Sequence, residues 1–285
     1  MSPDRFERNE AFFGRAGQEK LRGATITVVG VGGIGSHVVQ EAAFLGVGRI
    51  KCIDPEELDL SNRNRYIGSL ASDPIPGTLK VDIAERLIKS IDPEIQVEKY
   101  PYSLRHARSF EAIRTSDYVF GCVDKEGIRL VLTQFCAAYE KILFDIASDI
   151  EPEANRVRYG GRICVSRGDG CVLCLGLIDA AEAGLELGPD AARKERDKIY
   201  GLHRNVLGQT GPSVVSINGV VASLAVTEFM VEVTGVRRAN RLSTYRGDLG
   251  KVFVSVDAPS PDCFICKGLW GQGAAANLES QYLSR

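Results

Sequence analysis

The sequence lacks a surplus of charge of either sign. Its 35 lysines and arginines nearly balance 37 acidic residues, which gives a net charge of −2 and an isoelectric point near 6.0. Proteins that bind nucleic acid usually carry a clear excess of basic residues. The composition therefore speaks against nucleic acid as a partner.

Long apolar runs are also missing. No stretch reaches the roughly 18 consecutive apolar residues of a membrane-spanning helix, and residues 1–15 are charged throughout, unlike a signal peptide. Four of the eight cysteines, Cys52, Cys122, Cys136 and Cys164, occur singly in apolar surroundings, as reduced intracellular thiols do. We expect a soluble cytoplasmic protein with no membrane partner.

The other four cysteines form two pairs with the same spacing, Cys171–Cys174 and Cys263–Cys266. Two intervening residues let a tight turn direct both sulfurs at one ion, and tetrahedral zinc then requires a second pair. The pattern predicts a four-cysteine zinc site that brings the two segments together. Because thiolates fill all four positions, the zinc would be structural rather than catalytic. Redox-active pairs and metal-free thiols are the alternative interpretations.

The first half of the chain alternates short β-branched runs with helical periodicity. This pattern predicts strands at 25–29, 49–53, 96–100, 118–122 and 142–147, and helices at 4–21, 36–45, 80–91 and 126–138. Such alternation predicts an α/β fold with a Rossmann-like, doubly wound and mostly parallel sheet.

The second half is patterned differently. It predicts a hairpin over 156–165 with Gly160 and Gly161 at its turn, a long loop over 184–212, a buried apolar helix over 213–234, and strands at 242–246 and 251–256. These strands would extend the parallel sheet with antiparallel ones.

A glycine-rich turn follows the first predicted strand and contains Gly30, Gly32, Gly33 and Gly35. Such glycines let backbone amides and a helix N-terminus approach a phosphate closely. Asp54 ends the second predicted strand, where it can accept hydrogen bonds from ribose hydroxyls. Taken alone, this combination indicates NAD or FAD binding. A turn needed only for packing of the helix on the strand is a further alternative.

Basic residues beyond the ribose acid favour a triphosphate over a dinucleotide. Asn62, Arg63 and Arg65 follow it closely, Lys80 opens the next predicted helix, and Asp124 follows a strand. Arginine and lysine neutralise phosphate charge, while a free carboxylate can hold magnesium. The sequence therefore predicts an ATP site with Mg²⁺.

Together these residues resemble the E1-like adenylating enzymes, the family of ThiF, MoeB, HesA and the ubiquitin-activating domains. The matching segments are RFERN (5–9), GVGGIG (30–35), IDPEELDLSNRNR (53–65), GTLKVDIA (77–84), GCVDKEGIR (121–129), GPSVVSINGVVASLAVTEF (211–229) and both cysteine pairs. The resemblance spans nearly the whole chain, and the order of the motifs makes it specific.

The resemblance implies roles for the residues of the nucleotide site. Asp54 would bind the ribose, with Glu56 as a second acid nearby. Asn62, Arg65 and Lys80 would contact the ATP phosphates. Arg65 and Lys80 would also act in catalysis by neutralising the charge that develops on those phosphates.

Two further roles follow from the same resemblance. Asp124 would coordinate Mg²⁺, and Arg8 would reach into the active site of a partner subunit, which implies a homodimer. Arg63, Tyr66 and Lys125 depart from the family's usual leucine, glutamine and asparagine, and they indicate a divergent subfamily.

The implied reaction is adenylation of the C-terminal carboxylate of a small ubiquitin-like or sulfur-carrier protein that ends in Gly-Gly, with release of pyrophosphate. The chain would divide into an N-terminal helical arm (1–24), an ATP-binding half (25–165) and a carrier-binding half (166–285), with a crossover loop at 184–212. Because residues 175–262 contain no cysteine, we expect no obligatory thioester on this chain. Cys122 and Cys164 have the contexts of small buried residues.

Three alternatives remain at this point. The acyl group could belong to a peptide or to a threonylcarbamoyl group on tRNA, although the acidic balance disfavours tRNA. NAD-dependent redox chemistry would leave Arg65 and Lys80 without a purpose. A catalytically silent E1-like scaffold would have no reason to keep the charged residues of the nucleotide site.

Overall fold

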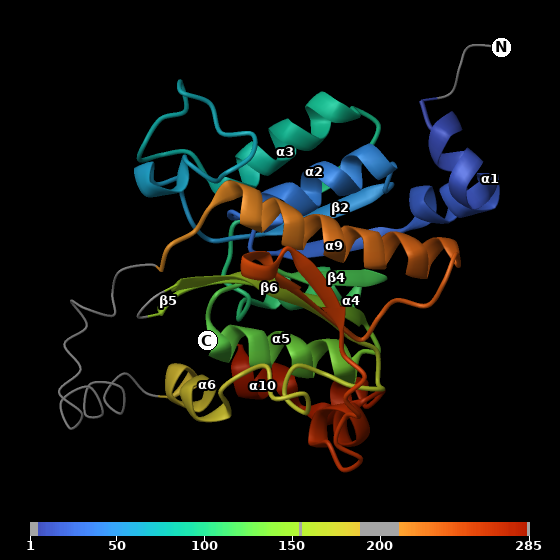
Figure 1. Cartoon of the computed structure of the whole chain (residues 1–285), viewed down its shortest axis with the longest axis vertical. Helices are drawn as coiled ribbons and strands as arrows, with labels where there is room; N and C mark the ends of the chain where they lie inside the picture. The colour runs from blue at the N-terminus through green and yellow to red at the C-terminus, as the bar shows by residue number, and fades with distance from the viewer. Residues whose placement is uncertain (1–4, 154–155, 189–210, 284–285) are drawn as a thin grey trace.

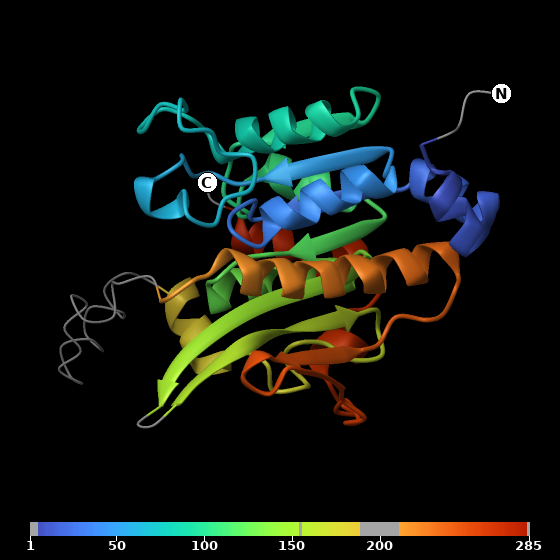
Figure 2. The ribbon, with the colours of Figure 1, turned by 45° about the horizontal axis from the view of Figure 1, so that its top comes forward.

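The computed structural model describes residues 5–153, 156–188 and 211–283, and it is built around one eight-stranded sheet (Figures 1 and 2). The strands lie in the order β3-β2-β1-β4-β5-β6-β7-β8. Their bounds are β1 (Thr25–Val29), β2 (Arg49–Ile53), β3 (Gln96–Tyr100), β4 (Tyr118–Gly121), β5 (Ile142–Glu153), β6 (Arg156–Ser166), β7 (Leu242–Arg246) and β8 (Lys251–Val254). The pairs from β3 to β5 are parallel, and those from β5 to β8 are antiparallel. The predicted fold class is confirmed.

Helices cover both faces of this sheet, as a doubly wound topology requires. They are α1 (Glu7–Gly23), α2 (Gly35–Leu45), α3 (Lys80–Ile91), α4 (Ala107–Arg114), α5 (Glu126–Ala138), α6 (Ala180–Leu187), α9 (Val215–Thr234) and α10 (Leu278–Tyr282). One layer holds α2, α3 and α9, and the other holds α4, α5 and α10 (Figure 1). The largest core cluster joins the first layer to the sheet, where the ring of Phe229 on α9 meets Phe120 and Phe144 edge-on.

Helix α9 is apolar because it is a core helix lying across the sheet, against β5, β6, α1 and α2 (Figure 2). By length and composition it could cross a membrane, and half of that stretch is buried inside the protein. Its polar Asn218 is buried and accepts a hydrogen bond from the Ser148 hydroxyl of β5 at 2.8 Å. This packing accounts for the apolar composition without a membrane.

The expected hairpin at 156–165 is wrong. Residues Arg156–Ser166 form one strand, which pairs antiparallel with β5 on one side and with β7 on the other. Gly160 and Gly161 lie within that strand, where a Cβ at Gly160 would fall 1.9 Å from the carbonyl oxygen of Tyr245 on β7. Glycine inside a strand often marks such a close approach of two backbones rather than a turn.

The long loop predicted at 184–212 is also partly wrong, because residues 184–187 belong to α6. The Asp179 carboxylate caps this helix by accepting hydrogen bonds from the amides of Ala181 and Glu182. Residues 189–210, the greater part of the expected crossover loop, lie outside the described residues. The short helix α4 was not predicted at all.

Candidate nucleotide and metal sites

The carboxyl ends of the parallel strands open into a pocket of about 910 Å³, the place where open α/β sheets bind ligands. Nine of the residues predicted to contact the nucleotide line it: Gly30, Gly32, Gly33, Asp54, Glu56, Asn62, Arg65, Lys80 and Asp124. The far wall is formed by the antiparallel strands, including residues 146–151 of β5, 158–162 of β6 and 244–246 of β7. The pocket thus has a glycine-rich side and a strand-built side.

The glycine turn is tightly folded between β1 and α2. Gly30 has a φ of +84°, and a Cβ there would lie 2.7 Å from the carbonyl oxygen of Cys122. Gly35 does not line the pocket; a Cβ there would lie 2.0 Å from the Gly30 carbonyl oxygen. Gly32, in contrast, has no atom within 4 Å of the position a Cβ would take. Gly35 therefore closes the turn, while Gly32 faces open space.

Asp54 is buried at the end of β2 and holds the turn together. Its carboxylate accepts hydrogen bonds from the amides of Val31 and Glu56, each at 2.9 Å. Burial raises the pKa of Asp54, and the positive charge of Lys80 acts in the opposite direction. The carboxylate oxygens keep lone pairs for further hydroxyl donors.

Lys80 is placed by the segment that follows Asp54. Its amide donates to the Glu56 carbonyl oxygen at 3.0 Å, and its carbonyl accepts a hydrogen bond from the buried Tyr66 hydroxyl at 2.7 Å. The Lys80 ammonium pairs with the Glu56 carboxylate at 2.5 Å. The Glu56 side chain is mostly exposed, whereas that of Lys80 is buried.

Arg65 lies on the turn after a short 3₁₀ helix, Leu60–Asn62. Asn62 takes part in a capping box with Asp59 at the start of this helix. The Arg65 guanidinium donates to the Ser61 carbonyl oxygen at 2.5 Å and to Asn64 at 3.1 Å. A Cβ on Gly33 would lie 3.3 Å from the aliphatic part of the Arg65 side chain. Arg65 therefore flanks the glycine turn.

Asp124 and Arg8 occupy different surroundings. Asp124 is exposed in the pocket, on the turn between β4 and α5. Arg8 is exposed on α1 and does not line this pocket. This position is the one expected of an arginine that acts in the site of a partner subunit. The role of Arg8 stays a prediction.

A charged cluster behind the pocket was not predicted. Asp145 on β5 is fully buried and binds Arg129 of α5 at 2.7 Å and Arg162 of β6 at 2.6 Å through the same oxygen. Both arginines line the pocket. A single acidic residue within the apolar strand pattern was the one signal in the sequence, and its partners lie 16 and 17 residues away in opposite directions.

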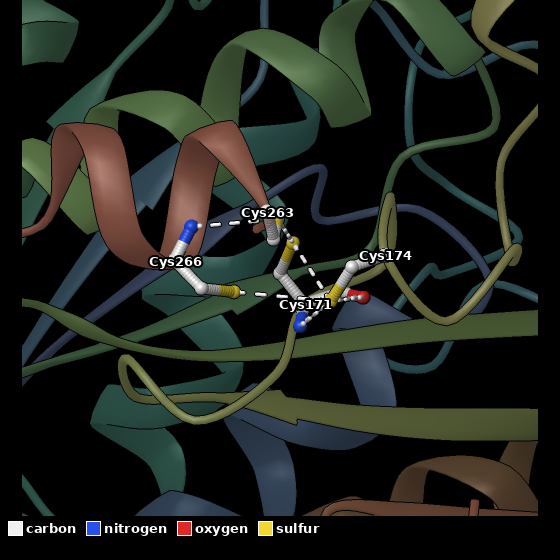
Figure 3. Close-up of side chains that lie close together, drawn as sticks. All are labelled: Cys171, Cys174, Cys263 and Cys266. Carbon is white, nitrogen blue, oxygen red and sulfur yellow. Dashed lines mark hydrogen bonds between the residues drawn. The ribbon is translucent and has the colours of Figure 1, made fainter. Parts of the chain in front are cut away.

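The four paired cysteines come together at one point, as predicted (Figure 3). All four sulfur atoms lie within 4.8 Å of one another. Three separations are 3.8 Å (Cys171 to Cys174), 3.7 Å (Cys171 to Cys263) and 3.9 Å (Cys174 to Cys266). A tetrahedron of sulfurs about 2.3 Å from one zinc ion has edges of about 3.8 Å. The donor set and its dimensions therefore fit a zinc ion.

The cysteine cluster joins two segments distant in sequence. Cys171 and Cys174 lie on the loop after β6, and Cys263 precedes a single-turn π-helix, Phe264–Leu269. Ile265 and Leu269 of that turn are buried with Ala137 of α5. A metal held here would fix the C-terminal segment on α5.

The single cysteines have surroundings that disfavour a thiolate. Burial, together with the nearby negative charge of Asp145, raises the pKa of both Cys122 and Cys164 well above the ordinary range. Burial raises the pKa of the Cys52 thiol to about 12. Nucleophilic cysteines normally show the reverse shift.

Comparison with known proteins identifies the family. A model of the ThiF family matches residues 6–264. The chain belongs to the ThiF family.

Several curated relatives align with parts of the chain. Adenylyltransferase and sulfurtransferase UBA4 of Lodderomyces elongisporus is 36% identical over 126 residues, 44% of this chain and 27% of the relative. The sulfur carrier protein adenylyltransferase of Thermus thermophilus is 32% identical over 123 residues, 42% of this chain and 45% of the relative. The tRNA threonylcarbamoyladenosine dehydratase of Bacillus subtilis is 41% identical over 92 residues, 32% and 35% of the two chains. The matches thus span less than half of each of these relatives.

Solved structures share the fold over most of the chain. E. coli MccB with ATP superimposes with a TM-score of 0.69 at 19% identity, covering 93% of this chain and 75% of MccB. A MccB complex with a variant of MccA gives a TM-score of 0.71 with the same identity and coverage. At this identity the likeness concerns the fold.

Proposed function

We propose that this protein is an ATP-dependent adenylyltransferase that activates the C-terminal carboxylate of a small ubiquitin-like or sulfur-carrier protein ending in Gly-Gly. The observation that carries the proposal is the meeting of Asp54, Arg65, Lys80 and Asp124 around one glycine turn in a single large pocket. Membership of the ThiF family and similarity to a sulfur carrier protein adenylyltransferase support it.

The chain's residues would act mainly by positioning and by charge. Asp54 binds the ribose with Glu56 beside it, and the amides of the glycine turn approach the phosphates. Arg65 and Lys80 neutralise charge that grows on the phosphates as the carboxylate attacks. Mg²⁺, held by Asp124, would add positive charge at the leaving pyrophosphate. The attacking carboxylate is already ionised at neutral pH, so no general base is needed.

The substrate side of the pocket is the wall made by β5, β6 and β7. A flexible C-terminal tail that enters between this wall and the glycine turn would bring its carboxylate to the phosphates. We propose zinc at the cysteine cluster as the structural support of the carrier-binding half. A cytoplasmic homodimer completes the proposal.

Exchange of labelled pyrophosphate into ATP tests this function. Exchange that depends on a carrier ending in Gly-Gly supports it, and Asp124→Asn should abolish that exchange while the protein stays folded. No exchange with any carboxylate would contradict adenylation and leave a silent scaffold.

A peptide is the second candidate for the acyl donor. E. coli MccB, whose superposition covers 93% of this chain, is seen in complex with a form of the peptide MccA. Exchange driven by a short synthetic peptide with a free C-terminus, but not by a folded carrier, would favour this alternative.

A further inference from the structure

The buried carboxylate of Asp145 lies at the centre of a set of contacts that reaches both sides of the pocket. One oxygen binds Arg129 at 2.7 Å and Arg162 at 2.6 Å. Arg129 also donates to the Val123 carbonyl oxygen at 2.5 Å, and Arg162 donates to the Leu177 carbonyl oxygen at 2.9 Å. All four of these partners line the pocket, while Asp145 itself is fully buried behind it.

The two carbonyls belong to functionally different segments. Val123 directly precedes Asp124, on the turn from β4 to α5. Leu177 belongs to the segment between the Cys171–Cys174 pair and α6. One carboxylate therefore connects the turn at the nucleotide side with the segment that leaves the metal site.

The sheet provides space for this arrangement. Asp145 pairs in register with Gly121 on β4 and with Cys164 on β6. A side chain at Gly121 would come within 3.0 Å of Leu132 and 3.6 Å of the second Asp145 oxygen. That oxygen has no hydrogen-bond partner among the described residues. The carboxylate is thus held almost entirely by the two guanidinium groups.

We propose that Asp145 is a positioning residue of the adenylation site. Through Arg129 it fixes the turn that carries Asp124. Through Arg162 it holds the segment after the first cysteine pair in a fixed position relative to that turn. The inference rests on the proposed function for its effect on nucleotide binding, but the mechanical connection exists whatever the enzyme adenylates.

Asp145→Asn tests the connection, with Glu228→Gln as a matched control. Glu228 is a buried carboxylate that binds Arg237 through two hydrogen bonds of 2.7 Å, outside the pocket. Hydrogen–deuterium exchange is measured on both variants without nucleotide. In Asp145→Asn we expect faster exchange at 121–127 and 175–179, and in Glu228→Gln only around 228–240. Unchanged exchange at 121–127 in Asp145→Asn would overturn the proposal.

The second readout is the Mn²⁺ concentration needed for half-maximal binding of ATP. Residues that support metal ligands typically change metal affinity by about 10- to 100-fold when mutated. We expect an increase of about 10-fold or more in Asp145→Asn and none in Glu228→Gln. A lower melting temperature with an unchanged Mn²⁺ requirement would mean a purely structural role and would overturn the proposal.

Asp145→Asn leaves the buried Arg129 and the partly buried Arg162 without a carboxylate and can fail to fold. Arg162→Lys is the milder variant, because lysine keeps the charge but cannot bridge two acceptors as the planar guanidinium does. Arg162→Lys should raise exchange at 175–179 more than at 121–127, and it should raise the Mn²⁺ requirement less than Asp145→Asn does. Exchange equal to that of wild type in both segments would contradict the proposal. If wild type binds ATP and Mn²⁺ but shows no pyrophosphate exchange, the proposed function fails while this connection stands.

Discussion

Asp54 illustrates how burial at a single residue can set the pH range of ligand binding. Burial raises its pKa, so the neutral form is reached on acidification at a higher pH than for an exposed aspartate, whose pKa is about 3.9. In the proposed function Asp54 accepts hydrogen bonds from the ribose hydroxyls, and protonation would remove an acceptor for them. ATP affinity therefore falls as the pH drops through this raised pKa. The contribution of Asp54 to folding stability rises over the same range, because burial penalises the ionised form.

We therefore predict that ATP affinity in wild type decreases on acidification, and that the decrease begins at a higher pH than an aspartate with the ordinary pKa of about 3.9 would give. Asp54→Asn should bind ATP about 10-fold more weakly or worse at pH 7, because a hydrogen bond to a charged group contributes about 1.5–3 kcal/mol. Its affinity should also lose this pH dependence. Isothermal titration calorimetry, with circular dichroism to confirm folding, measures both. An equal pH slope in the two proteins would refute the assignment.

Cys122 and Cys164 give the second prediction at this scale. Since burial and Asp145 raise the pKa of both thiols, neither should be alkylated by iodoacetamide in the native protein at neutral pH, although both should react after denaturation. Incubation with ATP and a carrier under non-reducing conditions should give no adduct on either cysteine by mass spectrometry. A thiol-sensitive adduct on either residue would establish a thioester step.

The glycine turn behaves as one element, in which neighbouring glycines serve opposite purposes. Gly35→Ala adds a Cβ 2.0 Å from the Gly30 carbonyl, and overpacking of this kind costs about 1–3 kcal/mol, despite the higher helix propensity of alanine. Gly32→Ala adds a methyl to open space in the pocket. We predict a lower melting temperature for Gly35→Ala, and a near-normal one with weakened ATP binding for Gly32→Ala. Thermal melts and calorimetry on both variants separate the two effects.

The local sequence pattern predicts those helices and strands whose residues show a helical or strand pattern of their own. The five parallel strands and α2, α3 and α5 came from β-branched runs and helical spacing, and the cysteine pairs from ligand spacing. Gly160 and Gly161 were assigned to a turn because glycine is ambiguous between a turn and a close strand contact, and only the neighbouring strand β7 resolves it.

The Asp145 cluster could not be predicted for a related reason. Its three charged residues come from a helix and two strands, and no spacing in the sequence relates them. The residues assigned to the nucleotide can be proposed from the sequence because each lies in a short contiguous motif, and their roles stay predictions. Interactions that depend on register between distant strands carry no local signal.

At the scale of the whole molecule, a homodimer would place Arg8 of one copy at the pocket of the other. Exposed Phe12, Phe44 and Val220 lie on α1, α2 and α9, three neighbouring helices that offer apolar surface. We predict that Arg8→Ala and Asp124→Asn are each inactive alone. Mixing them should restore part of the activity, because a mixed dimer contains one site with both residues intact. No recovery in a mixture shown by native mass spectrometry to contain mixed dimers would exclude action on the partner.

The cysteine cluster brings together two segments of the back half. Cys171 and Cys174 lie on the loop after β6, and Cys263 and Cys266 lie at the start of the last segment, which packs on α5. Zinc binding to such a site contributes directly to folding. We predict that Cys266→Ser loses bound zinc and exchanges amide hydrogens faster at 258–283, while ATP affinity stays within about 2- to 3-fold of wild type, a change below 1 kcal/mol.

Cys52→Ser is the control, because Cys52 is equally buried but belongs to the core around β2. It should keep its zinc, measured by release to a chromogenic chelator under denaturing conditions. If Cys266→Ser instead lost ATP binding together with its zinc, the metal site would support the nucleotide side as well. The contacts of Asp145 with Arg129 and Arg162 are then the route by which it would do so, and the double variant with Arg162→Lys should show no additional loss.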